Sequence, residues 1–125
     1  MLCDTEFLIC LQGGAGAAKK RRAEAFIESV HAPLYISRVC WMEFAEGCAT
    51  LANARRDLED FAVVEIDEAI AWHASRIARD LKGAGRHIGD NDVWIAATAV
   101  AHGLPPVSNN VRHLGRVPGL DLRTY

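Results

Sequence analysis

Two acidic residues precede the most apolar segment of the chain, and their position could support chemistry. Asp90 and Asp92 stand at the start of residues 93–101, which are apolar except for Thr98. Such a segment is typical of a helix that is buried on most sides. The first turn of a helix favours negative charge because its free backbone N–H groups and the positive end of the helix dipole lie there. We therefore predict that one of these acids is the N-cap of the helix, or that the pair belongs to a functional site.

Two more acids are expected near the same place in the fold. Asp4 follows a short apolar segment that predicts a strand, and Glu43 lies one turn beyond the end of a second predicted strand. At about 100° per residue, Glu43 lies roughly 160–200° from the apolar side of its own helix, so it points either to solvent or into a cleft. Sites in parallel sheets form beyond the carboxyl ends of the strands, so three or four carboxylates can converge there.

A cluster of carboxylates indicates a bound cation, because like charges at close range repel unless some are protonated or a cation lies among them. The candidate ligands are all hard oxygens, which suit Mg²⁺ or Mn²⁺ rather than zinc. Such an ion can lower the pKa of a water and stabilise a phosphoryl transition state. The acids therefore predict a metal-assisted phosphodiester hydrolase.

Three other kinds of site fit the sequence less well. A calcium loop would need a glycine turn and a distal glutamate after Asp90 and Asp92, where a buried helix is predicted instead. The glycine-rich residues 13–16 lack the spacing and the following lysine of a phosphate-binding loop. A receiver-type phosphoacceptor domain would need a late lysine beside its acids, and the chain has only Lys19, Lys20 and Lys82.

Short predicted strands alternate with amphipathic helices, which indicates a parallel sheet with helices on both faces. We expect one strand to end near Asp4, others over residues 34–39, 62–66 and 105–108, and a last edge strand at 120–123. We expect helices from residue 6 and over residues 17–30, 41–48, 53–61, 67–81 and 89–101. Asp67 is predicted as an N-cap and Gly103 as a C-cap.

The composition is that of an ordinary globular domain. Of the 125 residues, 50% are hydrophobic and 24% are charged, and the net charge of −2 argues against a protein coated with positive charge. The four cysteines form no C-x-x-C pair, so we interpret them as small core residues in a reducing compartment. With no signal-like or membrane-spanning segment in the sequence, we expect a cytoplasmic protein that does not bind a membrane.

Four segments of the sequence also match a family, in order and spacing. The chain resembles PIN-domain ribonucleases, specifically the VapC-type toxins of bacterial toxin–antitoxin pairs, over nearly all of its length. Residues 1–9 resemble the opening strand with its first acid, Asp4, and residues 36–43 resemble the second motif with Glu43. Residues 88–99 are the most specific match, with Asp92 as the third acid. Residues 108–114 and 116–120 resemble the closing motif.

The resemblance implies an α/β fold of the PIN type. This would be one domain over residues 1–125, a three-layer α/β/α sandwich with a short, mostly parallel central sheet of 4–5 strands. It also implies an endoribonuclease toxin that depends on Mg²⁺ or Mn²⁺, forms a homodimer, and is inhibited by a cognate antitoxin that inserts into its groove.

The resemblance gives the acids their expected roles. Asp4, Glu43 and Asp92 would be the catalytic metal ligands, with Asp90 either the helix cap or a further ligand. Asn110 could order a metal-bound water or a phosphate oxygen of the RNA. Basic residues could contact phosphates of the RNA, and the candidates are Arg38, Arg86 and Arg112.

Several positions differ from the family pattern. Glu6 stands where Asn is common, Cys40 stands where Thr is common, and neither Asn110 nor His113 is the acid that often closes the site. These differences motivate a second hypothesis, in which the chain is a PIN-like module that binds an antitoxin or RNA and cleaves weakly or not at all.

Overall fold

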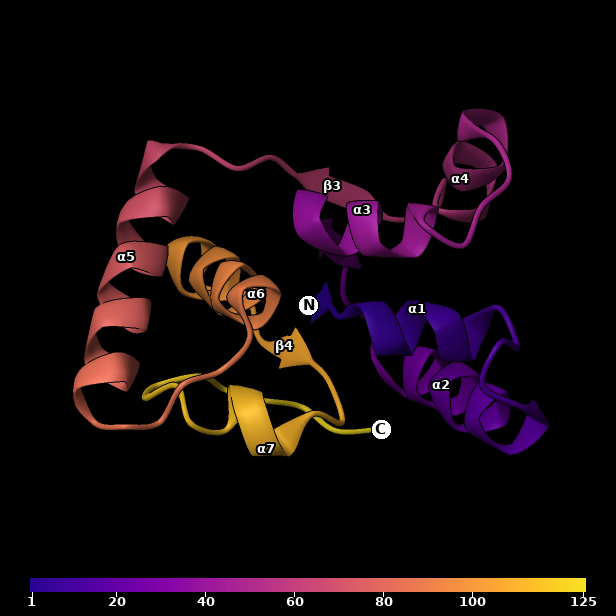
Figure 1. Cartoon of the computed structure of the whole chain (residues 1–125). Coiled ribbons are helices and arrows are strands. Elements are labelled where there is room, and N and C mark those ends of the chain that lie inside the picture. The colour runs from indigo at the N-terminus through magenta and orange to yellow at the C-terminus, as the bar shows by residue number, and fades with distance from the viewer.

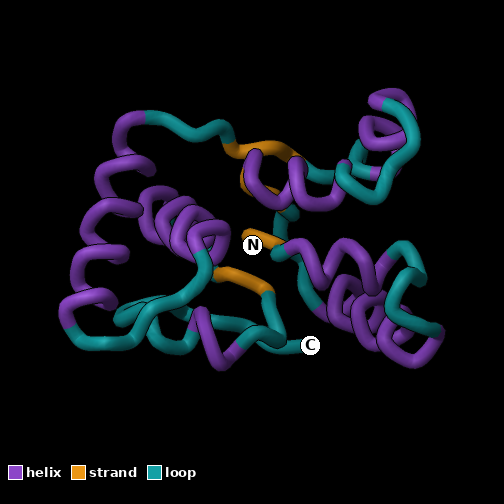
Figure 2. Tube along the Cα trace, in the orientation of Figure 1, coloured by secondary structure: helices purple, strands orange, loops and turns teal.

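The computed structural model describes residues 1–125 and contains one parallel β-sheet. Its order is β3-β2-β1-β4, and every paired neighbour is parallel. Figure 1 shows α1 and α2 on the right of the strands and α5 and α6 on the left, and Figure 2 shows how short the strands are. The strands are β1 (Leu2–Cys3), β2 (Tyr35–Ser37), β3 (Ala62–Val64) and β4 (Pro106–Val107). The predicted α/β architecture with a parallel central sheet is confirmed.

Seven helices connect and cover these strands. They are α1 (Thr5–Leu11), α2 (Ala17–Ser29), α3 (Arg38–Ala45), α4 (Leu51–Asp57), α5 (Glu68–Gly83), α6 (Asp90–His102) and α7 (Val111–Leu114). As predicted, the Asp67 side chain caps α5 by accepting from the Ile70 amide at 2.9 Å. Gly103 ends α6 with a φ of 61°, a left-handed conformation that glycine adopts without steric cost.

Several predicted boundaries are wrong because side-chain caps start helices early. The strand predicted over residues 34–39 stops at Ser37, whose hydroxyl accepts from the Cys40 amide at 3.0 Å and so begins α3. Thr50 caps α4 in the same way, so this helix starts at Leu51 rather than residue 53. The predicted edge strand at residues 120–123 reduces to a single parallel bridge between Val107 and Arg123.

The prediction that an acid caps α6 is also wrong. Gly89 occupies the N-cap position, and no side chain there accepts a hydrogen bond from the helix. Asp90 and Asp92 both lie in the first turn, where the helix dipole still favours them. Two other acids do cap helices, Asp4 at the start of α1 and Asp67 at the start of α5.

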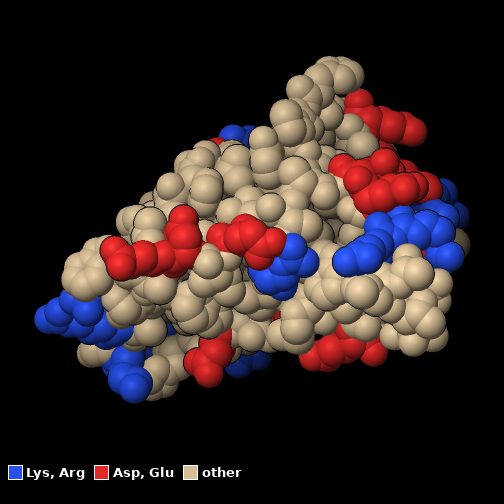
Figure 3. Space-filling model, turned by 90° about the horizontal axis from the view of Figure 1, so that it is seen from above, with Lys and Arg blue, Asp and Glu red and all other residues tan.

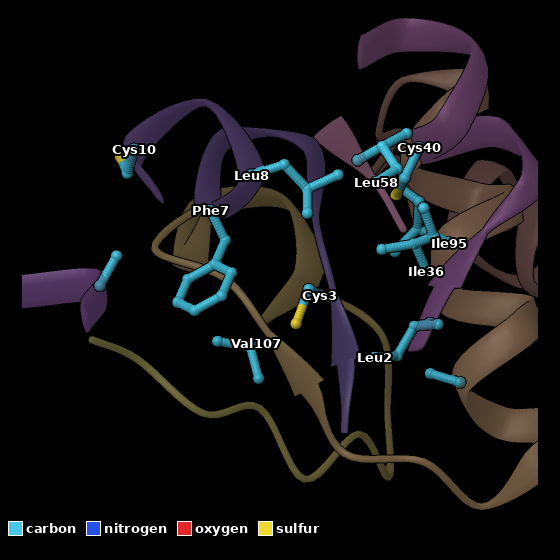
Figure 4. Packing of buried hydrophobic residues seen from close by; sticks show 12 residues of the cluster. Leu2, Cys3, Phe7, Leu8, Cys10, Ile36, Cys40, Leu58, Ile95 and Val107 are labelled. Atoms are coloured by element: carbon cyan, nitrogen blue, oxygen red, sulfur yellow. The ribbon is translucent and has the colours of Figure 1, made fainter. Parts of the chain in front are cut away.

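The main core lies where β1 is covered by helices. Figure 4 shows side chains from the first strand and helix packing beside those of β2, α6 and β4. Three of the four cysteines are buried, all four are free thiols, and burial raises the pKa of Cys40 to about 11. The cluster comprises Leu2, Cys3, Phe7, Leu8, Cys10, Ala23, Ile36, Cys40, Leu58, Ile95, Ala99 and Val107.

Helix α6 is the central helix of the fold. Six of its thirteen residues are buried, and its alanines let α5 pack closely through Ile70 and Ala74. This packing fixes the first turn of α6, and with it Asp92, beside the carboxyl edge of the sheet. None of the helices combines the length and the apolar character that crossing a membrane requires.

Candidate active site

Asp4 is held at the carboxyl end of β1 by its role as a helix cap. Its Oδ1 accepts a hydrogen bond from the Phe7 amide at 2.7 Å, and only 6% of the residue is exposed. Burial raises the pKa of Asp4 to about 6, and the charges of Glu6 and Asp92 add to the rise, whereas hydrogen bonds from Ser108 and Phe7 oppose it. The capping hydrogen bond therefore fixes the Asp4 carboxylate in a buried position where its ionised form is destabilised.

Glu43 points into a cleft between three helices rather than to open solvent. Its Oε2 accepts from the Thr5 hydroxyl on α1, and its Oε1 accepts from Nδ2 of Asn91 on α6 at 2.7 Å. The side chain thus lies on the side of α3 that faces away from the helix's own core contacts, which is the second of the two predicted orientations. The two neutral donors hold the carboxylate without neutralising its charge.

Asp92 is held by the segment that follows β4. Its Oδ2 lies 2.8 Å from Nδ1 of His113 and accepts from Nδ2 of Asn110 at 3.3 Å. An ionised carboxylate can only accept, so Nδ1 of His113 carries the proton in this contact. The two residues at which the closing motif lacks an acid therefore both contact the third acid directly.

These acids line one cavity of about 340 Å³. No lysine or arginine is among its lining residues, and the only ion-pair partner of the three acids is His113 with Asp92. The lining residues are Asp4, Thr5, Glu6, Glu43, Asp92, Ile95, Asn109 and Asn110. The cavity thus gathers four carboxylates, of which only Glu6 has a lysine or arginine partner, Lys19 at 3.4 Å.

The cavity suits a hard divalent cation by its chemistry, because all the charged groups that line it are carboxylates. In this structure, however, no three acidic, histidine or cysteine side chains lie close enough to one another to hold an ion together. Glu43 and Asp92 turn their oxygens to hydrogen-bond donors on neighbouring elements instead. The donor types therefore suit a metal, and in this structure the carboxylates are engaged by hydrogen-bond donors of the protein.

Four predicted site residues do not line the cavity. Arg38 pairs with Glu65 and lines a different cavity. Asp90 faces α5, where it lines a different cavity with Ala74 and Trp94, because two positions along a helix turn a side chain by about 200°. Arg86, in the loop after α5, and Arg112, on α7, are both exposed side chains outside the lining. The structure thus places Asp90 and the three arginines outside this cavity.

Three residues with clear contacts at the site had no predicted role. Thr5 and Asn91 both contact Glu43, and Asn109 lines the cavity next to Asn110. Thr5 and Asn91 each stand beside a predicted acid in the sequence, and that adjacency was the only available signal. Their partner lies far away in the chain, so the contact itself could not be predicted.

The comparison with protein families decides the classification. The family model for the PIN domain matches residues 1–120. The chain belongs to the PIN domain family. This PIN domain is 33% identical over 112 residues to Ribonuclease VapC1 of Methanocaldococcus jannaschii, with 86% of this chain and 77% of that one aligned. The resemblance to VapC-type proteins is therefore confirmed.

Solved structures agree with this assignment. VapBC-1 from nontypeable Haemophilus influenzae matches with a TM-score of 0.76 at 27% identity, over 99% of this chain and 95% of that one. VapBC2 from Rickettsia felis, bound to a DNA fragment from its promoter, matches with a TM-score of 0.80 at 18% identity, over 99% and 97%. The second match concerns the fold alone.

Proposed function

We propose that this PIN domain is an endoribonuclease that depends on Mg²⁺ or Mn²⁺ and acts as the toxin of a toxin–antitoxin pair. The observation that carries the proposal is the cavity lined by Asp4, Glu43 and Asp92, none of which is paired with a lysine or arginine. The name of the Methanocaldococcus jannaschii relative, a ribonuclease, supports RNA as the substrate. The reaction is hydrolysis of a phosphodiester bond by water.

Each residue has a part in this reaction. Asp4, Glu43 and Asp92 would hold the divalent ion, which when bound lowers the pKa of a water and stabilises negative charge on phosphoryl oxygens. Asn110 orients Asp92 and offers its amide to water or to a phosphate oxygen. Asn91 and Thr5 keep Glu43 turned towards the cavity. The arginines outside the cavity can contact only phosphates that are distant from the cleaved bond.

The proposal is tested by RNA cleavage with Mg²⁺, with Mn²⁺ and with chelator, in the wild type and in Asp92→Asn. We expect cleavage with either ion, none with chelator, and a loss of about a hundredfold or more in the variant, since even residues that only support metal ligands cost ten- to a hundredfold. Thr98→Ser, on the same helix, serves as the matched control. Activity that persists with chelator and in Asp92→Asn would show a contaminating nuclease.

An antitoxin is the proposed protein partner. The solved relatives include VapBC complexes, and a cavity of about 560 Å³ between α1 and α3 adjoins the acidic one. Glu43 lines both cavities, and the apolar side chain of Ile9 is 40% exposed in this second one. A peptide segment bound there would reach the acids and block RNA. The homodimer predicted from the family resemblance also stays a proposal.

A second candidate function is a PIN-like module that binds an antitoxin or RNA and does not cleave. Asp92 is engaged by His113 and Asn110 where the family often has a fourth acid, and this observation favours it. The two functions differ in metal binding as well as in activity. A wild type that binds neither Mn²⁺ nor Mg²⁺ in a calorimetric titration, while it still binds RNA, would support the module and contradict the nuclease.

A further inference from the structure

Helix α5 has an outer face that nothing in the molecule covers. Its inner side packs on α6 through apolar residues such as Ile70 and Leu81. At about 100° per residue, Trp72, Arg76 and Arg79 fall within roughly 60° of one another, on the side opposite the buried one. Trp72 is 60% exposed, the largest exposed fraction among the large hydrophobic residues of the chain. These three residues define what we term the α5 outer face.

The α5 outer face begins a positively charged stretch of an otherwise acidic chain. Four cations stand between residues 71 and 86, namely Arg76, Arg79, Lys82 and Arg86, against one acid. None of the four takes part in an ion pair. The acids nearest to them on the helix are Glu68 and Asp80. Figure 3 shows Lys and Arg side chains at the left end, where α5 lies, with acidic side chains beside them.

The exposed tryptophan is paired with one of these cations. The Arg76 guanidinium lies over the Trp72 ring, 4.4 Å from its centroid. Such cation–π contacts restrict both side chains before any partner arrives. An arginine beside an exposed aromatic ring is a combination that binds single-stranded nucleic acid, since the guanidinium contacts phosphate and the ring stacks with a base of any sequence.

The positive stretch leads directly to the helix that carries Asp92. Residues 84–89 join the end of α5 to the start of α6, and Figure 1 shows the two helices side by side with this loop between them. The loop is anchored where Nη1 of Arg116 donates to the His87 carbonyl at 2.7 Å. Arg86 is exposed within it. A strand of RNA that enters the acidic cavity can therefore continue along the loop onto α5.

The acidic cavity itself cannot attract RNA before a metal binds, because its charge has the same sign as that of the phosphates. Attraction must therefore come from elsewhere on the surface. We propose that the α5 outer face, continued by Lys82 and Arg86, binds a segment of the RNA substrate outside the cleavage site. The cations contact its phosphates and Trp72 stacks with a base. This proposal rests on the proposed ribonuclease function.

The test measures binding of a fluorescein-labelled single-stranded RNA of mixed sequence in chelator, so that no cleavage occurs. The double variant Arg76→Glu with Arg79→Glu should weaken binding about tenfold at low salt and reduce the salt slope by about 1 to 2, as expected when two phosphate contacts are lost. Arg76→Lys with Arg79→Lys keeps the charge and should retain most of the affinity. Trp72→Ala should weaken binding and leave the salt slope unchanged, because a stacking contact carries no charge.

The matched control is Arg21→Glu with Arg22→Glu, which makes the same charge change on exposed residues of α2. An equal loss in both charge-reversed variants would overturn the proposal, since it would reflect net charge alone. An unchanged affinity in the α5 variant would also overturn it. If the variants instead change the molar mass in solution, the face is a protein interface and not an RNA site.

The two proposals fail in different ways. If the wild type neither binds nor cleaves RNA, the ribonuclease function itself is wrong. If the wild type cleaves RNA with Mn²⁺ and the α5 variant cleaves it with the same KM, the function stands and only the α5 site is wrong. A raised KM with an unchanged kcat in the α5 variant supports the site, because these residues lie far from the cleaved bond.

Discussion

At the scale of single residues, Asp4 combines two demands that oppose each other. As the cap of α1 it is buried and held in place, and as the metal ligand proposed above it would have to be ionised. Burial raises the pKa of Asp4 to about 6, which means that ionisation of this carboxyl lowers the stability of the folded protein. A cation bound beside Asp4 would lower that cost, so the burial of this side chain would favour metal binding in the proposed function.

Replacement of Asp4 by Asn should stabilise the metal-free protein at neutral pH. The unfolded chain loses the Asp4 proton near pH 3.8 and the folded chain near 6, so the stability of the wild type falls between these values, by up to about 3 kcal/mol. Asn stays neutral and keeps the oxygen that accepts from Phe7. Urea unfolding in chelator at several pH values checks this. The difference in unfolding free energy should be small below about pH 4 and grow up to about pH 7; a constant difference would contradict the assigned cause.

The three acids could be predicted from the sequence at this scale because each stands at a fixed offset from an apolar pattern. Asp92 precedes a long apolar helix, and Asp4 directly follows a strand. The supporting contacts could not be predicted, because Asn91 and His113 find their partners through the tertiary fold. The direction of the Asp90 side chain could not be predicted either. We expected an acidic side chain as the N-cap of α6, and Gly89 occupies that position instead.

At the scale of elements, the segment after α7 contacts residues that line or hold the acidic cavity. The Asn109 amide forms two hydrogen bonds of 3.0 Å with the Tyr125 backbone, one in each direction. The Tyr125 ring packs edge-on against Phe7, with ring centroids 4.8 Å apart, and the Phe7 amide in turn holds Asp4. One terminal aromatic residue is therefore connected to two residues of the cavity lining.

Tyr125→Ala should reduce both stability and metal affinity. Loss of the aromatic contacts should cost about 2–3 kcal/mol of unfolding free energy. Because the start of α1 and Asn109 would loosen together, Mn²⁺ affinity measured by electron paramagnetic resonance should fall severalfold. Tyr125→Phe removes only the hydroxyl, whose partner is the Cys10 thiol at 3.7 Å, and is the control. If Tyr125→Ala loses stability but binds Mn²⁺ as tightly as the wild type, the segment has no influence on the site.

The long helices could be predicted from the sequence and the strand ends could not. Helices α5 and α6 have sustained apolar patterns, and their observed bounds are close to the predicted ones. The strands are only two or three residues long, and Ser37 and Thr50 start helices by accepting backbone hydrogen bonds within stretches that also favour other structures. The start of each of these helices depends on one side-chain hydroxyl rather than on a repeating pattern of apolar residues.

At the scale of the whole molecule, acidic and basic side chains are concentrated in different regions, although the net charge is only −2. The acids meet in one cavity, and unpaired cations follow α5 on another side. Composition alone therefore excluded a fully basic protein correctly and gave no sign of the local positive surface.

Addition of Mn²⁺ should stabilise the whole molecule. An ion bound only by the folded state adds about 2.7 kcal/mol to the unfolding free energy at a hundredfold excess over its Kd. The midpoint of thermal unfolding should therefore rise with Mn²⁺ in the wild type and much less in Asp92→Asn. Ca²⁺ and Na⁺ at matched ionic strength separate specific binding from screening. Equal shifts in both proteins would mean that the ion binds outside the acidic cavity.

The order of the strands in the sheet has a consequence for the order in which the site is assembled during synthesis. Strand β1 is synthesised first and lies between β2 and β4, so one of its two neighbours is among the last strands to be made. Asn110, which contacts Asp92, follows β4 directly. A growing chain therefore carries Asp4, Glu43 and Asp92 before it carries β4 and Asn110. If the chain is the ribonuclease proposed above, its site is complete only once residues 106–110 have been synthesised and have folded beside β1.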